Sequence, residues 1–184
     1  MADFFRDYFL KISSHINQVD LTLLEEAVAL IKSVHVRGGK LILAGNGGSA
    51  AIASHVAVDL TKNTGIRAIN FNESDLITCF ANDYGYERWV EMALKYYADA
   101  EDLLILISSS GRSPNILNAA AKAEEMEMRL VTFSGFLPDN PLRKKGIINF
   151  WVDSSNYNYV EMAHHVWLLA ITDRLVADLR CEVK

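Results

Sequence analysis

Apolar side chains recur every three or four positions across residues 3–19, and the same spacing returns across residues 21–36. This period predicts two amphipathic helices. Asp20 is suited to cap the second helix, and Gly38 and Gly39 follow its end. We therefore expect a helical pair ahead of the first strand. It packs either against another subunit or against the protein's own sheet.

From residue 40 onward, short apolar runs alternate with helical patterns. The runs cover residues 41–44, 66–71, 103–107, 130–133 and 147–152, and the helical patterns cover residues 50–61, 86–98, 115–125 and 157–179. Strands separated by helices predict βαβ units and a parallel sheet. We therefore predict one α/β domain over residues 1–184, a flavodoxin-like three-layer sandwich with a five-stranded parallel sheet. Residues 1–37 would form a helical extension, and residues 38–184 the α/β core.

The bulk composition narrows the classes of partner. The 184 residues are 51% hydrophobic and 22% charged, with a formal net charge of -5. A mildly acidic surface repels phosphate backbones, so we expect neither nucleic acid nor a membrane as a partner. The chain has two cysteines in no metal-type spacing, and neither a secretory leader nor a membrane-length apolar stretch is recognisable. These features predict a cytoplasmic protein.

Two polar loops follow predicted strands. Residues 45–49 read GNGGS and residues 108–114 read SSSGRSP, each just ahead of a helical pattern. Ligands of open parallel sheets bind beyond the carboxyl ends of the strands. Glycines let a ligand approach the backbone closely, and the following helix offers free N–H groups to an anion. Ser113 is suited to the N-cap and Pro114 to the first helical position.

The two loops together predict a phosphate-ester site, although each could instead be an ordinary turn or cap. The first loop matches neither the dinucleotide-binding consensus nor the P-loop consensus, so we expect no nucleotide cofactor. A third segment, residues 82–85 (NDYG), falls between helical patterns. Its Asp83 is suited either to binding sugar hydroxyls or to capping the helix that starts near Tyr86.

Three segments of this chain, GNGGS, ANDYG and ISSSGRSPN, together resemble the SIS (sugar isomerase) family, and most of all its phosphoheptose isomerase branch. The resemblance implies a homotetramer that isomerises sedoheptulose 7-phosphate to a glycero-manno-heptose 7-phosphate for surface polysaccharides. The substrate-binding residues that it implies are Asn46, Gly47, Gly48, Ser49, Asn82, Asp83, Ser108, Ser109, Ser110 and Ser113.

The same family carries a zinc site, which this chain matches only in part. His55 stands at the family's histidine, Asp59 at its glutamate, Glu161 at its glutamine and Leu169 at its distal histidine. Residues four apart share a helix face, so His55 with Asp59 and Glu161 with His165 could form a four-ligand site for zinc. Alternatively, the histidines are partly buried helix residues and Asp59 is a solvated side chain.

Aldose–ketose isomerisation requires a base beside the substrate carbon and an acid or metal at the carbonyl oxygen. Asp59 and Glu161 are the candidate bases, and His165 is the candidate acid. The departures from the family pattern leave two alternatives. The chain could isomerise another phosphosugar of surface polysaccharide synthesis, or it could bind a phosphosugar or a protein partner without catalysis.

Overall fold

A computed structural model describes residues 2–182 of the chain. Its helices are α1 (Ala2–Asn17), α2 (Leu21–Val36), α3 (Gly48–Thr64), α4 (Ser74–Tyr84), α5 (Trp89–Tyr97), α6 (Pro114–Glu125), the 3-10 helix η1 (Leu142–Lys144) and α7 (Tyr157–Glu182). Its strands are β1 (Leu41–Gly45), β2 (Ala68–Asn70), β3 (Leu103–Ser108), β4 (Arg129–Ser134) and β5 (Ile148–Trp151).

The strands of residues 2–182 form one five-stranded parallel sheet in the order β2-β1-β3-β4-β5. This is the flavodoxin-like order. In the register of the central strands, Leu41 lies opposite Leu103, and Gly45 lies opposite Ile107. The strand order reverses at β1 and β3, so the loops that follow these two strands meet at one point of the sheet edge. The predicted fold class is confirmed.

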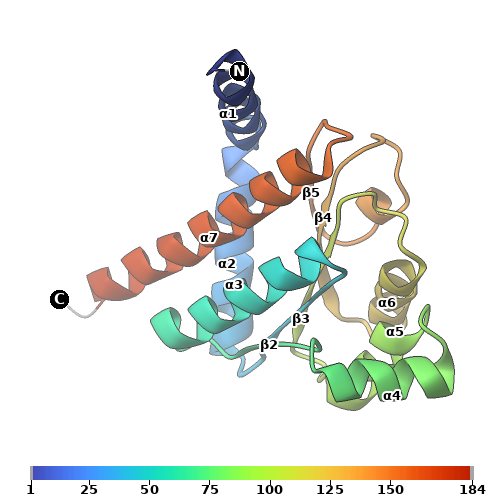
Figure 1. The fold of residues 1–184 in the computed structure, drawn as a ribbon. Helices are drawn as coiled ribbons and strands as arrows, with labels where there is room; N and C mark the ends of the chain where they lie inside the picture. Colours follow the sequence, from blue (N-terminus) through green and yellow to red (C-terminus); the bar gives the residue numbers. More distant parts are fainter. Residues whose placement is uncertain (1, 183–184) are drawn as a thin grey trace.

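Helices cover both faces of the sheet, which gives three layers (Figure 1). One apolar core lies between the sheet and α2, α3 and α7, and the other lies between the sheet and α4, α5 and α6. The side chains of β1 and β3 are buried along their whole length, as expected for strands covered on both faces. The two cores hold the carboxyl ends of these strands in fixed positions.

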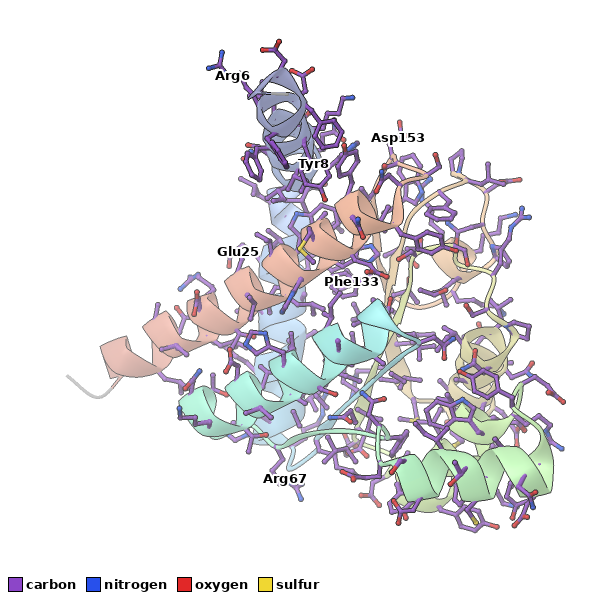
Figure 2. The ribbon with its side chains drawn as sticks, in the orientation of Figure 1. Arg6, Tyr8, Glu25, Arg67, Phe133 and Asp153 are labelled. Atoms are coloured by element: carbon purple, nitrogen blue, oxygen red, sulfur yellow. The ribbon has the colours of Figure 1, made fainter. Side chains whose placement is uncertain are left out.

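The two leading helices have different surroundings. Ala27, Val28, Ile31 and Val34 of α2 are buried in the core against the sheet. Helix α1 instead extends beyond the sheet and packs on α7, with the Tyr8 ring 5.2 Å from that of Tyr159 (Figures 1 and 2). The large apolar side chains of α1 that stay exposed are Phe4, Phe5, Phe9 and Leu10. The boundary predicted at residue 37 stays a prediction, although α2 packs as part of the sandwich.

One helix differs from the sequence expectation. Residues 74–84 form α4, whose apolar side chains Leu76, Ile77 and Phe80 are only partly buried on the second core. Asn82 and Asp83 therefore lie in the last turn of a helix, and the expectation of a loop at these two residues was wrong. Strand β2 covers three residues, although its flanking residues Ile66 and Phe71 are also buried.

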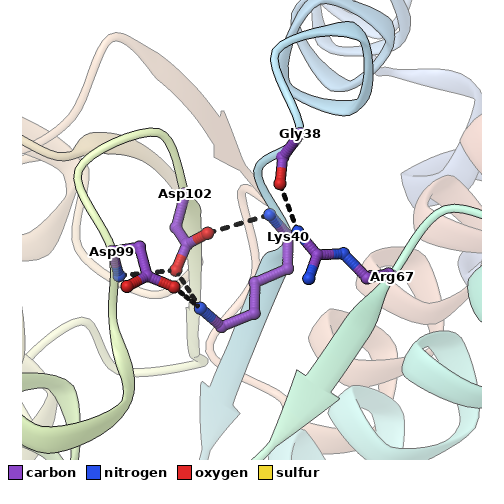
Figure 3. A network of polar contacts seen from close by, with 5 residues as sticks. All are labelled: Gly38, Lys40, Arg67, Asp99 and Asp102. Atoms are coloured by element: carbon purple, nitrogen blue, oxygen red, sulfur yellow. Dashed lines mark hydrogen bonds and ion pairs between the residues drawn. The ribbon is translucent and has the colours of Figure 1, made fainter.

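A charged network ties together the amino ends of β1 and β3 (Figure 3). The Lys40 ammonium donates to the carboxylates of Asp102 and Asp99, and the Asp102 carboxylate also accepts the backbone N–H groups of Lys40 and Asp99. Burial acts to lower the pKa of Lys40, but the hydrogen bonds to the two carboxylates outweigh it and raise the pKa. Beside this network, the Arg67 guanidinium donates to the Gly38 carbonyl.

The longest helix, α7, carries charged residues throughout its second half. Across residues 2–182, no helix combines the length and the hydropathy that crossing a bilayer would require.

Candidate functional site

An open cavity of about 270 Å³ lies at the carboxyl ends of β1 and β3. Both predicted phosphate-binding loops line it, through Asn46, Gly47, Gly48, Ser49, Ser108, Ser109, Ser110 and Ser113. Ile107, Tyr157 and Glu161 complete the lining. The structure thus brings together eight of the ten residues expected to bind substrate.

The first loop passes close to its neighbours and requires glycine at two positions. Gly47 has a φ of +54°, a conformation that glycine adopts readily. A Cβ on Gly48 would overlap the carboxyl group of Glu161. Helix α3 starts at Gly48, so the positive end of its dipole faces the cavity.

The serine loop surrounds the other side of the cavity with hydroxyl groups. Ser108 and Ser109 are each 5% exposed, and the Oγ atoms of Ser108 and Ser113 lie 3.3 Å apart. Among the residues that the structure describes, the buried Ser109 Oγ has no hydrogen-bond partner. Ser113 occupies the N-cap position of α6, but its side chain makes no capping bond within residues 2–182. Its hydroxyl is therefore available to a ligand.

Glu161 is the carboxyl group of the cavity. It lies one turn into α7, and its carboxyl group lies beside Gly48 at the amino end of α3. Burial raises the pKa of Glu161 above the usual glutamate range. A raised pKa brings the carboxyl group closer to a value suited to proton transfer near neutral pH.

Tyr157 forms the outer wall of the cavity, and sequence reasoning assigned it no role. Its ring meets that of Phe136 at 4.8 Å in an edge-on arrangement. Phe136 has a φ of +57°, a sparsely populated conformation for a residue with a Cβ. The only available sequence signal was position, because Tyr157 opens the helix that follows the last strand.

The four expected metal ligands separate into two places. The His55 Nδ1 lies 2.8 Å from the His165 Nε2, and the His55 Nε2 lies 3.3 Å from the Asp59 carboxylate. Burial lowers the pKa of His165, nearby His55 lowers it further, and Asp59 opposes both effects. Glu161 lines the cavity and does not join the contacts among His55, His165 and Asp59.

The donor set therefore fits a metal ion in part. Two imidazole nitrogens converge, and Asp59 is placed to orient the other nitrogen of His55, as a carboxylate commonly does for a metal-bound histidine. Within residues 2–182, no three His, Cys, Asp or Glu side chains gather as a metal-binding group. Leu169, at the family's distal histidine, is partly buried against the apolar core, so it is a packing residue.

Asn82 and Asp83 lie outside the lining of the cavity. Both are exposed, and the Asn82 amide donates to the Asp83 carboxylate at 2.9 Å. Their expected contact with a substrate stays a prediction.

The cavity combines two chemical capacities. The positive ends of α3 and α6 and the hydroxyls of Ser108, Ser109 and Ser113 suit a phosphate group. Glu161 offers a carboxyl group with a raised pKa on the opposite side. Together they can bind an anionic tail and move a proton on the molecule that carries it.

Comparison with known proteins agrees with this geometry. The family profile described as SIS domain matches residues 4–135. A phosphoheptose isomerase from Helicobacter pylori (strain P12) is 36% identical over 119 residues, which span 61% of this chain and 62% of that relative. The chain is thus aligned with less than two thirds of its relative's length.

Two solved structures share the fold. Phosphoheptose isomerase GmhA from Neisseria gonorrhoeae superposes with a TM-score of 0.85 at 24% identity, covering 95% of both chains. A phosphoheptose isomerase from Francisella tularensis superposes with a TM-score of 0.87 at 24% identity, covering 96% of this chain and 98% of the other. At this identity the likeness concerns the fold.

Proposed function

This chain belongs to the SIS domain family, and from that premise and the cavity we propose that it is a phosphosugar isomerase. We propose sedoheptulose 7-phosphate as the substrate and a glycero-manno-heptose 7-phosphate as the product. The similarity to phosphoheptose isomerases from several bacteria supports this choice of substrate.

One observation carries the proposal: the buried hydroxyl of Ser109, in a loop of serines at the start of α6, has no hydrogen-bond partner among the residues that the structure describes. An unpaired buried polar group is unfavourable unless a ligand or water completes its hydrogen bonding. A phosphate oxygen would satisfy Ser109 and could also accept from Ser108 and Ser113. This contact would anchor the substrate away from its reacting carbons, so that binding energy serves to position them.

Glu161 is the proposed base. Its carboxylate would remove a proton from the carbon next to the carbonyl, and the C–H electron pair would become the C=C bond of an enediol. The carbonyl oxygen gains a proton from the acid at the same time. Glu161 then returns the first proton to the former carbonyl carbon, while the other enediol hydroxyl gives its proton to the deprotonated acid and becomes the new carbonyl, which yields the isomer. Glu161 is better suited than Asp59, because Glu161 lines the cavity whereas Asp59 pairs with His55.

His165 is the proposed acid, one helical turn beyond Glu161 on α7. Its contact with His55, which in turn pairs with Asp59, would hold the ring and set the nitrogen that carries the proton. We retain zinc as part of the proposal, with His55 and His165 as the residues that would hold it and Glu161 and Asp59 as the further candidates. A bound zinc ion would supply Lewis-acid polarisation of a carbonyl oxygen.

We further propose a cytoplasmic homotetramer that acts in surface polysaccharide synthesis. The exposed aromatic face of α1, with Phe4, Phe5 and Phe9, supports subunit contacts through this helix. Light scattering coupled to size exclusion would measure the mass of the assembly. A monomer at micromolar concentration would overturn the tetramer without affecting the proposed chemistry.

The test of the proposed function is isomerisation of sedoheptulose 7-phosphate by the purified chain, before and after chelator treatment and zinc addition. We expect turnover by the wild type, and for Glu161→Gln we expect turnover to be lost while phosphosugar affinity is largely kept. Metal analysis of protein purified without chelator decides the zinc part separately. No turnover under any of these conditions would contradict the assignment.

A second candidate function is phosphosugar binding without catalysis. Leu169 favours it, because an apolar packing residue stands where the family has a histidine that both binds metal and transfers protons. In this case a phosphosugar would raise the melting temperature, and no candidate sugar would be turned over. Glu161→Gln would then change neither property appreciably.

A further inference from the structure

A reciprocal pair of side-chain amides connects the two loops of the cavity. The Asn46 Nδ2 donates to the Asn115 Oδ1 at 2.9 Å, and the Asn115 Nδ2 donates to the Asn46 Oδ1 at 2.8 Å. Asn46 lies in the loop after β1, and Asn115 lies in the first turn of α6 after the serine loop. This pair therefore fixes one loop relative to the other.

The two members of the pair face different surroundings. Asn115 is 1% exposed, whereas Asn46 is half-buried and lines the cavity. A buried amide that loses its partner incurs the full penalty of an unsatisfied polar group. Asn115 is thus held in place by burial, and Asn46 is held by Asn115.

Tyr86 makes the third contact of this network. Its hydroxyl donates to the Asn46 Oδ1 at 3.1 Å, although the residue itself is 55% exposed. The segment that carries Tyr86 joins α4 to α5, and the Asn118 amide of α6 anchors it by donating to the Glu87 carbonyl at 2.8 Å. Three segments distant in sequence therefore converge on the Asn46 side chain.

The hydrogen-bonding capacity of Asn46 is almost used up by these contacts. A carboxamide has two acceptor sites on oxygen and two N–H donors on nitrogen. The Asn46 oxygen accepts from Asn115 and Tyr86, and its nitrogen uses one N–H on Asn115. One N–H remains for a ligand in the cavity, and both acceptor sites are occupied.

We propose that Asn115 and Tyr86 are positioning residues that present Asn46 to the substrate as a single N–H donor. Its acceptor would be a hydroxyl or carbonyl oxygen of the phosphorylated sugar. This inference rests on the proposed function for the identity of the substrate. It adds that Asn115 and Tyr86 set the orientation of Asn46, the residue that would contact the sugar. Neither Asn115 nor Tyr86 needs to touch the sugar.

The test compares kcat and KM of Asn115→Asp, Asn115→Ala and Tyr86→Phe with those of the wild type. Asn115→Asp keeps the size of the side chain but turns a carboxylate oxygen toward the Asn46 Oδ1, so kcat/KM should fall about 10- to 50-fold. Tyr86→Phe removes one hydrogen bond at an exposed site, and kcat/KM should fall about fivefold. If Asn115 only fills space, Asn115→Asp would behave like the wild type.

Coupling to Asn46 separates positioning from a general effect on folding. In an Asn46→Ala background, Tyr86→Phe should have no further effect on kcat/KM, because its partner is already gone. Two variants serve as controls. Asn149→Ala removes a different side-chain amide, which hydrogen-bonds to Thr132 on the neighbouring strand. Tyr97→Phe removes the hydroxyl of a different exposed tyrosine. Both control variants should keep wild-type kcat/KM. Additive effects of Tyr86→Phe and Asn46→Ala would overturn the proposal.

A second measurement does not depend on catalysis. The side-chain NH₂ resonances of Asn46, identified by their loss in Asn46→Asp, should move in Tyr86→Phe and Asn115→Ala and stay in place in Tyr97→Phe. An inactive wild type that shows these shifts would contradict the proposed function alone. Unchanged Asn46 resonances in both variants would overturn this inference, whatever the activity.

Discussion

The carboxyl group of Glu161 lies against the Cα of Gly48, so that α7 and α3 meet at the cavity without room for a Cβ between them. Gly48 is the first residue of α3, and Glu161 is the fifth residue of α7. The proposed base is therefore positioned by the absence of a side chain on the facing helix.

Gly48→Ala should displace the Glu161 carboxylate while leaving the fold intact, because the flexible end of the glutamate can move aside. A shift of about an ångström at a reacting group can lower the rate on the order of 100-fold. We expect kcat to fall by roughly 10- to 100-fold with a melting temperature close to that of the wild type. An unchanged kcat would mean that the position of Glu161 against Gly48 has no role in turnover.

Ser109→Ala should separate ligand binding from stability. It removes a buried hydroxyl that has no partner among the residues described, so the unliganded protein should be as stable as the wild type or slightly more stable. The Kd for a phosphosugar should rise about 10- to 150-fold, since a hydrogen bond to a charged group contributes roughly 1.5–3 kcal/mol. Calorimetric titration measures the affinity, and the exposed Ser155→Ala serves as control. Equal affinities of Ser109→Ala and Ser155→Ala would exclude a phosphate contact at Ser109.

Asp102→Ala should destabilise the chain far more than Asp99→Asn. The Asp102 side chain is 1% exposed and shares the Lys40 ammonium with Asp99, which is 82% exposed. Removing one partner of a buried pair typically reduces the free energy of unfolding by about 3–5 kcal/mol, whereas an exposed pair contributes about 0–1 kcal/mol. Urea unfolding of both variants measures the difference. Similar losses in the two variants would show that burial of Asp102 is unimportant.

Stability should decline in mild acid because of His164. This residue is fully buried, its Nε2 donates to the Ser134 carbonyl, and its Nδ1 is unpartnered among residues 2–182. Burial lowers the pKa of His164 to about 4 from 6.5. As the pH falls, the unfolded chain therefore binds the proton before the folded chain does. The contribution of His164 to the free energy of unfolding is complete above the unfolded pKa near 6.5. This contribution decreases as the pH falls toward 4, by roughly 3 kcal/mol in total.

The matching measurement is the free energy of unfolding between pH 4.5 and 7.5 for the wild type and His164→Phe. The difference between their slopes isolates His164 from the other groups that titrate in this range. We expect a shallower slope for the variant. Parallel curves would mean that the buried imidazole does not titrate differently in the folded and unfolded states.

The strand pattern could be predicted from the sequence because β1 and β3 are apolar up to their last residues, Gly45 and Ser108. Helix α4 could not, because none of its residues is fully buried and its apolar side chains, Leu76, Ile77 and Phe80, form only a short stripe. The same weakness made Asn82 and Asp83 look like loop residues. The apolar pattern thus identified the fully buried strands and missed the short, half-exposed α4.

For the site, sequence spacing identified which side chains share a helix face, but it did not identify the residues that each side chain contacts. Glu161 and His165 are four residues apart, yet Glu161 faces the cavity and His165 contacts His55. That division depends on how α7 crosses α3, which is a property of tertiary packing. Asn115 escaped notice for the same reason, since its partner Asn46 lies 69 positions away.

The most direct test of a phosphate-anchored sugar site is the melting temperature of the wild type with sedoheptulose 7-phosphate and with unphosphorylated sedoheptulose. The account predicts that the phosphorylated sugar raises the melting temperature in a concentration-dependent way. The free sugar should cause little change at the same concentration. Equal stabilisation by both sugars, or by neither, would contradict it.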